Sequence, residues 1–479
     1  MKWTRKIVIV CCAMAVAGFG AVVIGRILPL GIPGQWTWPM IVVRPRPIDM
    51  ILAGCGIGLY IGFAAIGFRG IHKVARMRES LWVAGLVMAS VMVQLAVHSG
   101  APDGFGLTKW VSVAIPGSSG YFDVAKSRAM ADPWRFWSEY PVWIQKQDAL
   151  HVGTHPPGLF LASRAALGVM NTFPSMASSI AAMTPESVVS GFRFLIGETP
   201  VRERSAVVLI AILTLVSCSL TVAPLYLLAR FSLPAQSSWV TAAIWPLIPS
   251  AILFQPTADT AFPFIATSAL ALAVWGGPLR SISAGILLGI GMQFTLAFLP
   301  VGLAVAFVLL GSNRDRRKRV ADVAWTGAGF LGMTIGIWLV SGANPWVIWW
   351  WNQKNHARFY EQFPRSYGAW VAANPVELAV AIGLPTSIFA AIGFGSRTAP
   401  RSAWIGVLVL AVLNFSGKNL SEVARLWLPF MPMLLAAAGA GFEKIEGNAR
   451  TLGVILMLLA IQTLMLQSTI QVVYPLFDG

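Results

Sequence analysis

The chain has 479 residues, of which 56% are hydrophobic and only 11% are charged, and its mean hydropathy is +0.70. So few polar side chains cannot cover a water-soluble domain of this size, and the composition therefore excludes a soluble fold and indicates an all-α polytopic membrane protein. The net charge of +16 does not indicate a nucleic-acid partner, because Lys and Arg occur in short clusters between apolar runs rather than on one face.

Apolar runs of about 20 residues, the length that crosses about 30 Å of hydrocarbon, recur along most of the chain, and we count about 12 to 13. The run 282–311 is long enough for either one helix or two. The predicted segments are N-terminal transmembrane helices (1–98), an outer loop with interfacial helices (99–155), a transmembrane core (156–342), an outer aromatic and basic loop (343–372) and C-terminal transmembrane helices (373–479).

Clusters of basic residues predict the orientation of these segments. The most basic clusters are "MKWTRK", "RGIHKVARMRES" and "RDRRKR", and "SRTAPRS" and "EKIEGNAR" are weaker examples. Short loops rich in Lys and Arg remain in the cytoplasm. We therefore expect an integral membrane protein with a cytoplasmic N-terminus, and the segments 99–155 and 343–372 on the outer face.

The first outer loop mixes carboxylates with aromatic residues, which is typical of helices that lie in the membrane interface. "YFDVAKSRAM" has apolar residues near helical spacing and predicts one such helix, and "ADPWRFWSEYPVW" predicts a second. The loop supplies three candidate catalytic carboxylates, Asp103, Asp123 and Asp148.

The stretch "LHVGTHPPGLFLASRAALG" begins the next predicted span. Thr154 is a suitable N-cap, and prolines are tolerated in the first turn of a helix because the N–H groups there have no intrahelical partner. The prolines would then hold His151 and His155 at the water boundary. These two histidines lie near Asp148, but no Cys or third His joins them, so we predict no zinc site; a divalent cation held loosely by carboxylates and a phosphate is a further hypothesis.

Ionisable residues at the edges of later apolar runs are also informative, because a charge at membrane depth is costly. Asp259 begins an otherwise apolar run and is either a helix N-cap or a site residue. In "SGKNLSEVARLWLPFMP", Glu422 and Arg425 are three residues apart and can pair with each other. Alternatively, Lys418 and Arg425 form a basic pair that suits a lipid phosphate.

The second outer loop, "NPWVIWWWNQKNHARFYEQFPRSYGAW", combines an aromatic run with Lys354 and Arg358. One interpretation is an aromatic belt with solvated charges, since Trp is enriched at membrane interfaces. The functional alternative is a platform that binds a sugar or a lipid phosphate.

The layout resembles the GT-C class of membrane glycosyltransferases, which includes the protein O-mannosyltransferases and the bacterial aminoarabinose transferases. The resemblance rests on the long outer loop with acidic residues, followed by "HPPGLFL" at the place of a His- or Lys-Pro-Pro motif. It extends to "SAGILLGIGMQFTLAFLPVGLAVAFVLLG" and, more loosely, to "SEVARLWLPFMP". It implies that 156–342 is a GT-C-like core in a bacterial cytoplasmic membrane.

The resemblance further implies transfer of a sugar from a polyprenyl-phosphate donor to a glycan, lipid or protein acceptor on the outer face. In one respect the chain departs from the family, because Gly117 and Ser118 stand where its paired Asp-Glu is expected. Asp123 is then the nearest substitute for the general base, with Asp103 and Asp148 as alternatives. The residues expected to bind the donor phosphate or substrate are His151, His155, Asp259, Lys354, Arg358, Lys418 and Arg425.

Two other functions remain open from the sequence. A transporter or flippase of a lipid-linked saccharide also needs charged residues near the outer face, and it predicts a polar pathway that continues to the cytoplasmic side. A scaffold without chemistry would leave the histidines and Asp259 as caps and belt residues. In every case membrane lipid is a partner.

Overall fold

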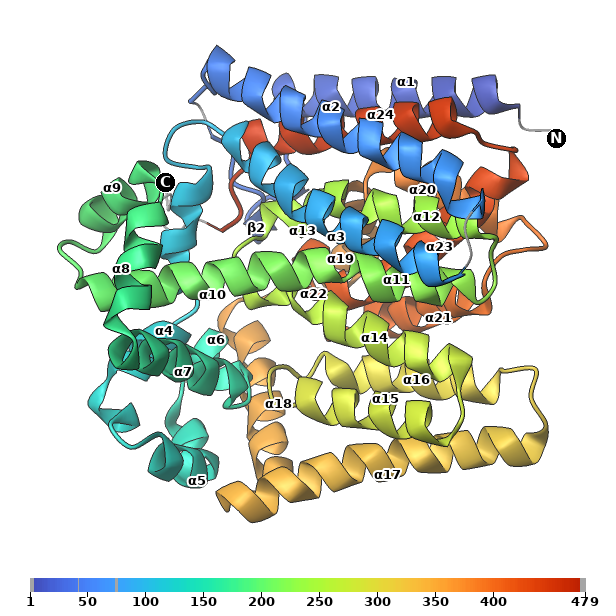
Figure 1. Ribbon diagram of the computed structural model, residues 1–479. Coiled ribbons are helices and arrows are strands. Elements are labelled where there is room, and N and C mark those ends of the chain that lie inside the picture. Colours follow the sequence, from blue (N-terminus) through green and yellow to red (C-terminus); the bar gives the residue numbers. More distant parts are fainter. Residues whose placement is uncertain (1–3, 42, 74–75, 474–479) are drawn as a thin grey trace.

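The computed structural model describes residues 4–41, 43–73 and 76–473, and nearly all of its regular structure is helical (Figure 1). The strands in these ranges form one small antiparallel hairpin of β1 (Gly31–Ile32) and β2 (Trp36–Thr37). The predicted all-α membrane fold is therefore confirmed.

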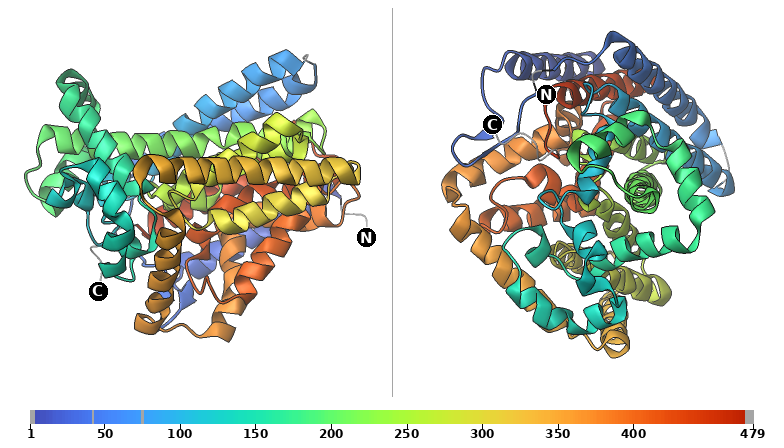
Figure 2. Two further views of the ribbon diagram at one scale, coloured as in Figure 1. Left: turned by 90° about the horizontal axis from the view of Figure 1, so that it is seen from below. Right: turned by 90° about the vertical axis from the view of Figure 1, so that its left-hand side faces the viewer.

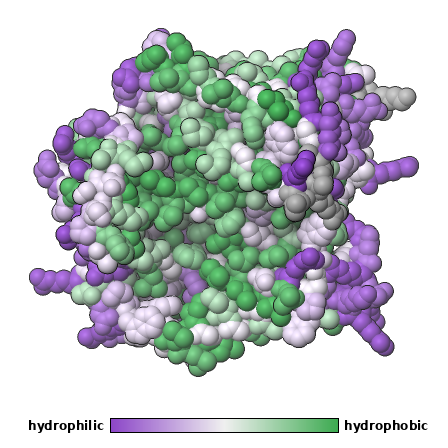
Figure 3. Space-filling model, in the orientation of Figure 1, coloured by the Kyte–Doolittle hydropathy of each residue, from purple (hydrophilic) through white to green (hydrophobic). Residues whose placement is uncertain are grey.

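Seven continuous helical segments in the described ranges are long and apolar enough to cross a membrane. These segments are formed by α1 (Arg5–Ile24), α2 (Pro47–Gly70) with the turn Ile71–Lys73, α3 (Arg76–Ser99), α10 (Val201–Leu220) with α11 (Val222–Arg230), α14 (Phe262–Trp275) with the preceding turn Ala258–Thr260, α17 (Arg316–Ser341) and α24 (Ala449–Thr469). An eighth is reached if α19 (Tyr367–Ala381) and α20 (Leu384–Phe394), which meet at a bend of 106°, count as one span. Many of their apolar side chains are exposed, so the outer surface is suited to lipid (Figure 3).

The other predicted spans are shorter or broken helices. The run 282–311 forms two helices, α15 (Pro278–Gly291) and α16 (Phe298–Leu310). Between 235 and 253 the chain breaks at Pro246 and Pro249, because proline cannot donate the backbone hydrogen bond that would continue the helix. The remaining helices of the later chain are α12 (Ala235–Ile244), α13 (Pro249–Leu253), α21 (Arg401–Phe415), α22 (Val423–Leu426) and α23 (Met431–Lys444).

Small residues allow the helices of the core to approach one another closely. A Cβ atom on Gly285 or Gly329 would collide with the backbone of the facing helix in the pair α15 and α17. The same is true of Gly393 and Gly441 in the pair α20 and α23. Such contacts are the usual basis of packing between membrane helices, where lipid removes the hydrophobic advantage of burial.

The long helices run side by side, so the bundle has two distinct ends. The basic end, on the right of Figure 1, carries Arg5, Lys73, Arg316, Arg401 and Lys444 at the helix termini. At the opposite end, here named the cavity end, the chain forms shorter elements, and Figure 2 (right) looks onto it. These are η2 (Leu107–Ala114), α4 (Tyr121–Lys126), α5 (Pro133–Trp143), α6 (His151–Thr154), α7 (Gly158–Thr172), α8 (Pro174–Met183), α9 (Glu186–Leu195) and α18 (Pro345–Gln362).

The first outer loop contains one buried segment as well as surface helices. In Leu107–Ala114, the residues Lys109, Trp110 and Val111 are buried within the protein against α9 and α10. The expected amphipathic helices are present as the short α4 and as α5, whose N-cap Asp132 accepts hydrogen bonds from the backbone of Trp134.

The Pro-Pro motif also behaves differently from prediction. Thr154 ends α6 and donates a hydrogen bond back to Leu150 O at 2.8 Å, so it does not cap the following helix. Helix α7 begins after Pro157 and has 15 residues, or about 22 Å, which is less than the hydrocarbon thickness. The prolines separate two helices and do not begin a membrane span.

Candidate functional site

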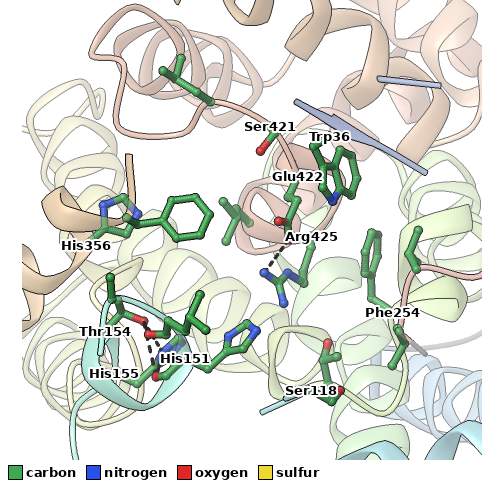
Figure 4. A pocket seen from close by; sticks show the side chains of 18 of the residues that line it. Trp36, Ser118, His151, Thr154, His155, Phe254, His356, Ser421, Glu422 and Arg425 are labelled. Atoms are coloured by element: carbon green, nitrogen blue, oxygen red, sulfur yellow. Dashed lines mark hydrogen bonds and ion pairs between the residues drawn. The ribbon is translucent and has the colours of Figure 1, made fainter. Parts of the chain in front are cut away.

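Two adjoining cavities, of about 350 and 250 Å³, open at the cavity end of the bundle, and Figure 4 shows the larger one. Their walls come from elements far apart in the sequence, namely α6, α18, α22 and the turn before α14. The residues shared by both cavities are His151, Thr154, His155, His356, Arg425 and Leu426. The predicted histidines and Arg425 therefore lie together in space.

Arg425 lies between two carboxylates. Its Nη2 is 2.6 Å from Oε2 of Glu422, and its Nε is 3.8 Å from Oδ2 of Asp259. Burial opposes the charge of Arg425, but Glu422 and Asp259 hold its pKa above the usual value. Among the described residues its Nε–H has no hydrogen-bond partner, although the side chain is only 17% exposed. A buried donor without a partner is available to an anionic ligand.

The turn before α22 places the Glu422 carboxylate beside Arg425. Ser421 and Glu422 have φ values of 87° and 56°, a left-handed conformation that residues other than glycine rarely adopt. Both residues line the larger cavity. Strained backbone of this kind is concentrated at functional sites. The predicted pairing of Glu422 with Arg425 is confirmed, but it accounts for only part of the surroundings of Arg425.

Asp259 belongs to the short 3-10 turn Ala258–Thr260 and lines the smaller cavity. Its prediction as a helix N-cap is wrong, because Ala261 occupies the N-cap position of α14 and the Asp259 side chain is near Arg425 instead. Tyr121 is also close, since burial and the charge of Asp259 raise the pKa of its hydroxyl. The ring of Tyr121 packs edge-on against His155 at 5.4 Å.

Burial keeps the histidines of the site neutral. It lowers the pKa of His151 to about 3 and that of His356 to about 4, and it also lowers the pKa of His155. His155 Nδ1 lies 3.0 Å from His151 O and 3.1 Å from Thr154 Oγ1. Neutral imidazoles can donate or accept a hydrogen bond without adding charge.

Two buried asparagines on α18 hold the segment 151–155, here named the histidine turn, in place. Asn352 Nδ2 donates to Gly153 O at 3.1 Å and to His155 O at 3.0 Å. Asn355 Nδ2 donates to Gly153 O at 2.8 Å and to Ile144 O at 3.1 Å. Gly153 is required at this tight turn, because a Cβ atom there would collide with Asp148 O and would crowd Asn355 Nδ2. Sequence reasoning missed both asparagines, and their spacing of three residues on an aromatic helix was the available signal.

The predicted catalytic carboxylates of the outer loop lie elsewhere. In the part of the chain that the structure describes, neither cavity is lined by Asp103, Asp123 or Asp148. Asp103 is exposed 3.5 Å from Arg46, and Asp148 accepts a hydrogen bond from Leu150 N at the start of α6. Asp123 is exposed on α4 because the apolar side of that short helix faces the protein. The carboxylates of the cavities are those of Asp259 and Glu422.

The predicted basic residues are divided between the site and the surface. Lys418 lines the smaller cavity. Lys354 is exposed and lies 5.3 and 5.0 Å from the rings of Trp350 and Trp351, while Arg358 donates to Gln147 O at 3.1 Å. Neither Lys354 nor Arg358 lines the two cavities described above.

Lys109 lines neither cavity and was not predicted as a site residue. Its fully buried Nζ donates to Ile252 O at 3.1 Å and to Leu253 O at 3.3 Å, at the end of α13. Burial lowers the pKa of Lys109 to about 7. The next residues along the chain include Phe254 and Thr257, which line the larger cavity, and so Lys109 supports its wall.

Among the described residues, no group of three or more His, Cys, Asp or Glu side chains is arranged to hold a metal ion. The hypothesis of a loosely held divalent cation therefore gains no support from a ligand set. Gly117 and Ser118, which stand where the GT-C class would supply paired acids, do line the larger cavity. Comparisons with models of protein families and with curated proteins find no match to this chain.

Proposed function

We propose that the chain is a membrane glycosyltransferase that moves a sugar from a polyprenyl-phosphate donor to a glycan, lipid or protein acceptor. The observation that carries the proposal is Arg425, which lines both cavities beside two carboxylates and neutral histidines and whose Nε–H has no hydrogen-bond partner among the described residues. A phosphate can accept hydrogen bonds from Arg425, and Lys418 supplies a second positive charge. The resemblance to the GT-C class agrees with this function.

The proposed orientation follows from the two ends of the bundle. Basic loops remain cytoplasmic, so the basic end and the N-terminus belong on the inner side of a bacterial cytoplasmic membrane. The cavity end, with α6, α18 and α22, then belongs on the outer face. Donor and acceptor would meet there, outside the cytoplasm.

In the proposed reaction, an acceptor hydroxyl attacks the anomeric carbon of the donor. The new C–O bond forms as the bond from that carbon to the phosphate oxygen breaks, and polyprenyl phosphate leaves with one more negative charge. Asp259 takes the hydroxyl proton, because its carboxylate lies beyond hydrogen-bond distance of Arg425, whereas Glu422 is fixed to Arg425 at 2.6 Å. Arg425 and Lys418 stabilise the leaving phosphate.

The test is sugar transfer by the purified protein in lipid vesicles, with radiolabelled mannosyl, glucosyl, galactosyl and aminoarabinosyl polyprenyl phosphates as donors. Asp259→Asn should lower the rate by about 10²- to 10⁴-fold, the usual contribution of a general base. Asp123→Asn is the matched control, since it removes an exposed carboxylate of the same end, and its rate should equal that of the wild type.

Loss of transfer in Asp123→Asn with retention in Asp259→Asn would restore the base predicted from the sequence. Binding of a lipid-linked saccharide without transfer, together with its movement between leaflets, would instead support the flippase. Thermal unfolding of each variant in detergent controls for misfolding.

A further inference from the structure

The loop between α1 and α2 forms part of the wall of the larger cavity. In this loop the residues 32–35 form a four-residue turn. Its second residue is Pro33, its third is Gly34 with a φ of +77°, and Gln35 N donates to Ile32 O at 3.1 Å. This is the sequence and geometry of a type II turn. The turn closes the β1–β2 hairpin, whose last strand carries Trp36, and Trp36 lines the cavity beside Glu422 and Arg425 (Figure 4).

Gln35 joins the hairpin to the bundle by several hydrogen bonds. Gln35 Nε2 donates to Ser366 Oγ at 2.5 Å, and Gln35 Oε1 accepts from Ser366 N at 2.8 Å and from Trp370 Nε1 at 2.9 Å. Gln35 O accepts from Arg365 Nη1 at 2.7 Å. These bonds join the hairpin to the junction of α18 and α19, so the position of Trp36 over the cavity is defined.

Aromatic packing also supports Trp36. Its ring lies 6.4 Å from that of Trp38 and 6.3 Å from that of Trp370, and Trp38 is buried against Phe254. Trp36 itself is only partly buried, because one side borders the cavity. The indole is therefore held in place but available to a ligand.

The groups that share the cavity with Trp36 are hydrogen-bonding side chains. Arg425, His151 and Ser118 point into the same space in Figure 4. An apolar ring opposite several polar groups fits a saccharide, because a pyranose packs its C–H face on an aromatic ring while its hydroxyls make hydrogen bonds. We propose that the space beneath the hairpin is a saccharide subsite in which Trp36 binds the apolar face of the sugar. This subsite rests on the proposed function for its role in transfer.

The test compares Trp36→Leu with Trp36→Phe in the full-length protein. Leucine keeps apolar contact with Trp38 and Trp370 but removes the aromatic face, and phenylalanine restores a ring. Two measurements are made: the KM and kcat of transfer from the four donors above, and saturation-transfer NMR of methyl mannoside, glucoside and galactoside. Trp134→Ala is the control, since Trp134 is an exposed tryptophan of the same end that does not line the cavity.

We expect Trp36→Leu to raise the KM about tenfold with little change in kcat, and to lose the NMR signal of the sugar ring protons. Trp36→Phe should recover most of both. If the wild type transfers sugar but Trp36→Leu has an unchanged KM and NMR signal, the subsite is overturned and the proposed function is upheld.

If glycosides bind in a way that depends on Trp36 but the wild type does not transfer sugar, the subsite is upheld and the proposed enzyme is overturned. If the wild type neither binds glycosides nor transfers sugar, both are overturned.

Discussion

Replacing Lys109 by methionine should remove a pH dependence from the free energy of unfolding. Burial lowers the pKa of Lys109 from 10.5 to about 7, and unfolding restores the ordinary value. Between these values the unfolded chain binds more protons than the folded one, so stability rises with pH by up to about 1.4 kcal/mol per pH unit. Below about pH 7 both states are protonated, and burial of the charge costs at most about 5 kcal/mol.

The measurement is denaturant titration in detergent micelles at pH 7 and pH 9. The wild type should gain about 2 kcal/mol over these two units relative to Lys109→Met, because folded Lys109 is already about half deprotonated at pH 7 and the other lysines titrate equally in both proteins. Lys126→Met is the matched control, since Lys126 is partly exposed in its pair with Glu203 and should leave the pH dependence unchanged. Parallel pH curves for the wild type and Lys109→Met would refute the argument that burial lowers the pKa of Lys109 in the folded protein.

Three further predictions concern the histidine turn and the outer loop. Asn352→Ala should lower the unfolding free energy by about 1–3 kcal/mol, because the buried carbonyls of Gly153 and His155 each lose a donor; equal midpoints in denaturant titration would contradict this. The pKa of His356 is lowered to about 4, so the unfolded state binds more protons below pH 6.5 and stability should fall between pH 6.5 and 4; His356→Gln should reduce that fall, as measured by titrations at both pH values. Asp103→Asn should change stability by less than about 1 kcal/mol, because its ion pair is exposed, and a larger change in thermal unfolding would argue against that structure.

The all-α membrane class could be predicted from hydropathy, because a chain that crosses lipid must satisfy its own backbone hydrogen bonds. The number of spans could not, since about 12 to 13 were expected and seven segments, or eight with the bent pair, are long and apolar enough in the described residues. Breaks within the apolar runs were harder to predict. The run 282–311 is divided between Gly291 and Phe298, and a Cβ atom on Gly291 would collide with the Phe298 ring, a contact that hydropathy does not reveal. The bend between α19 and α20 occurs at Gly383, whose φ is +88°. Glycine can adopt this left-handed conformation, but its presence in an apolar run does not predict that the helix bends there.

The site could be predicted in part, for a physical reason. Asp259 and Arg425 stand at the edges of apolar runs, where a charge is costly, and that cost identified them. Asp123 lies outside both cavities, because an amphipathic pattern places a charge on the polar side of a helix and that side of α4 faces solvent. Trp36 was not found, because its place over the cavity depends on contacts between Gln35 and residues more than 300 positions later.

The charges of the site explain how two carboxylates can surround an arginine that we propose binds a phosphate. Arg425 and Lys418 balance Asp259 and Glu422, and the histidines contribute no charge because burial keeps them neutral. In the proposed reaction the leaving phosphate gains a negative charge at the moment when Asp259 gains a proton. The net charge of the cavity is therefore constant, while the attraction of Arg425 shifts from Asp259 to the phosphate. Electrostatic stabilisation thus increases as the glycosidic bond breaks, which is the condition for lowering the barrier rather than only binding the donor.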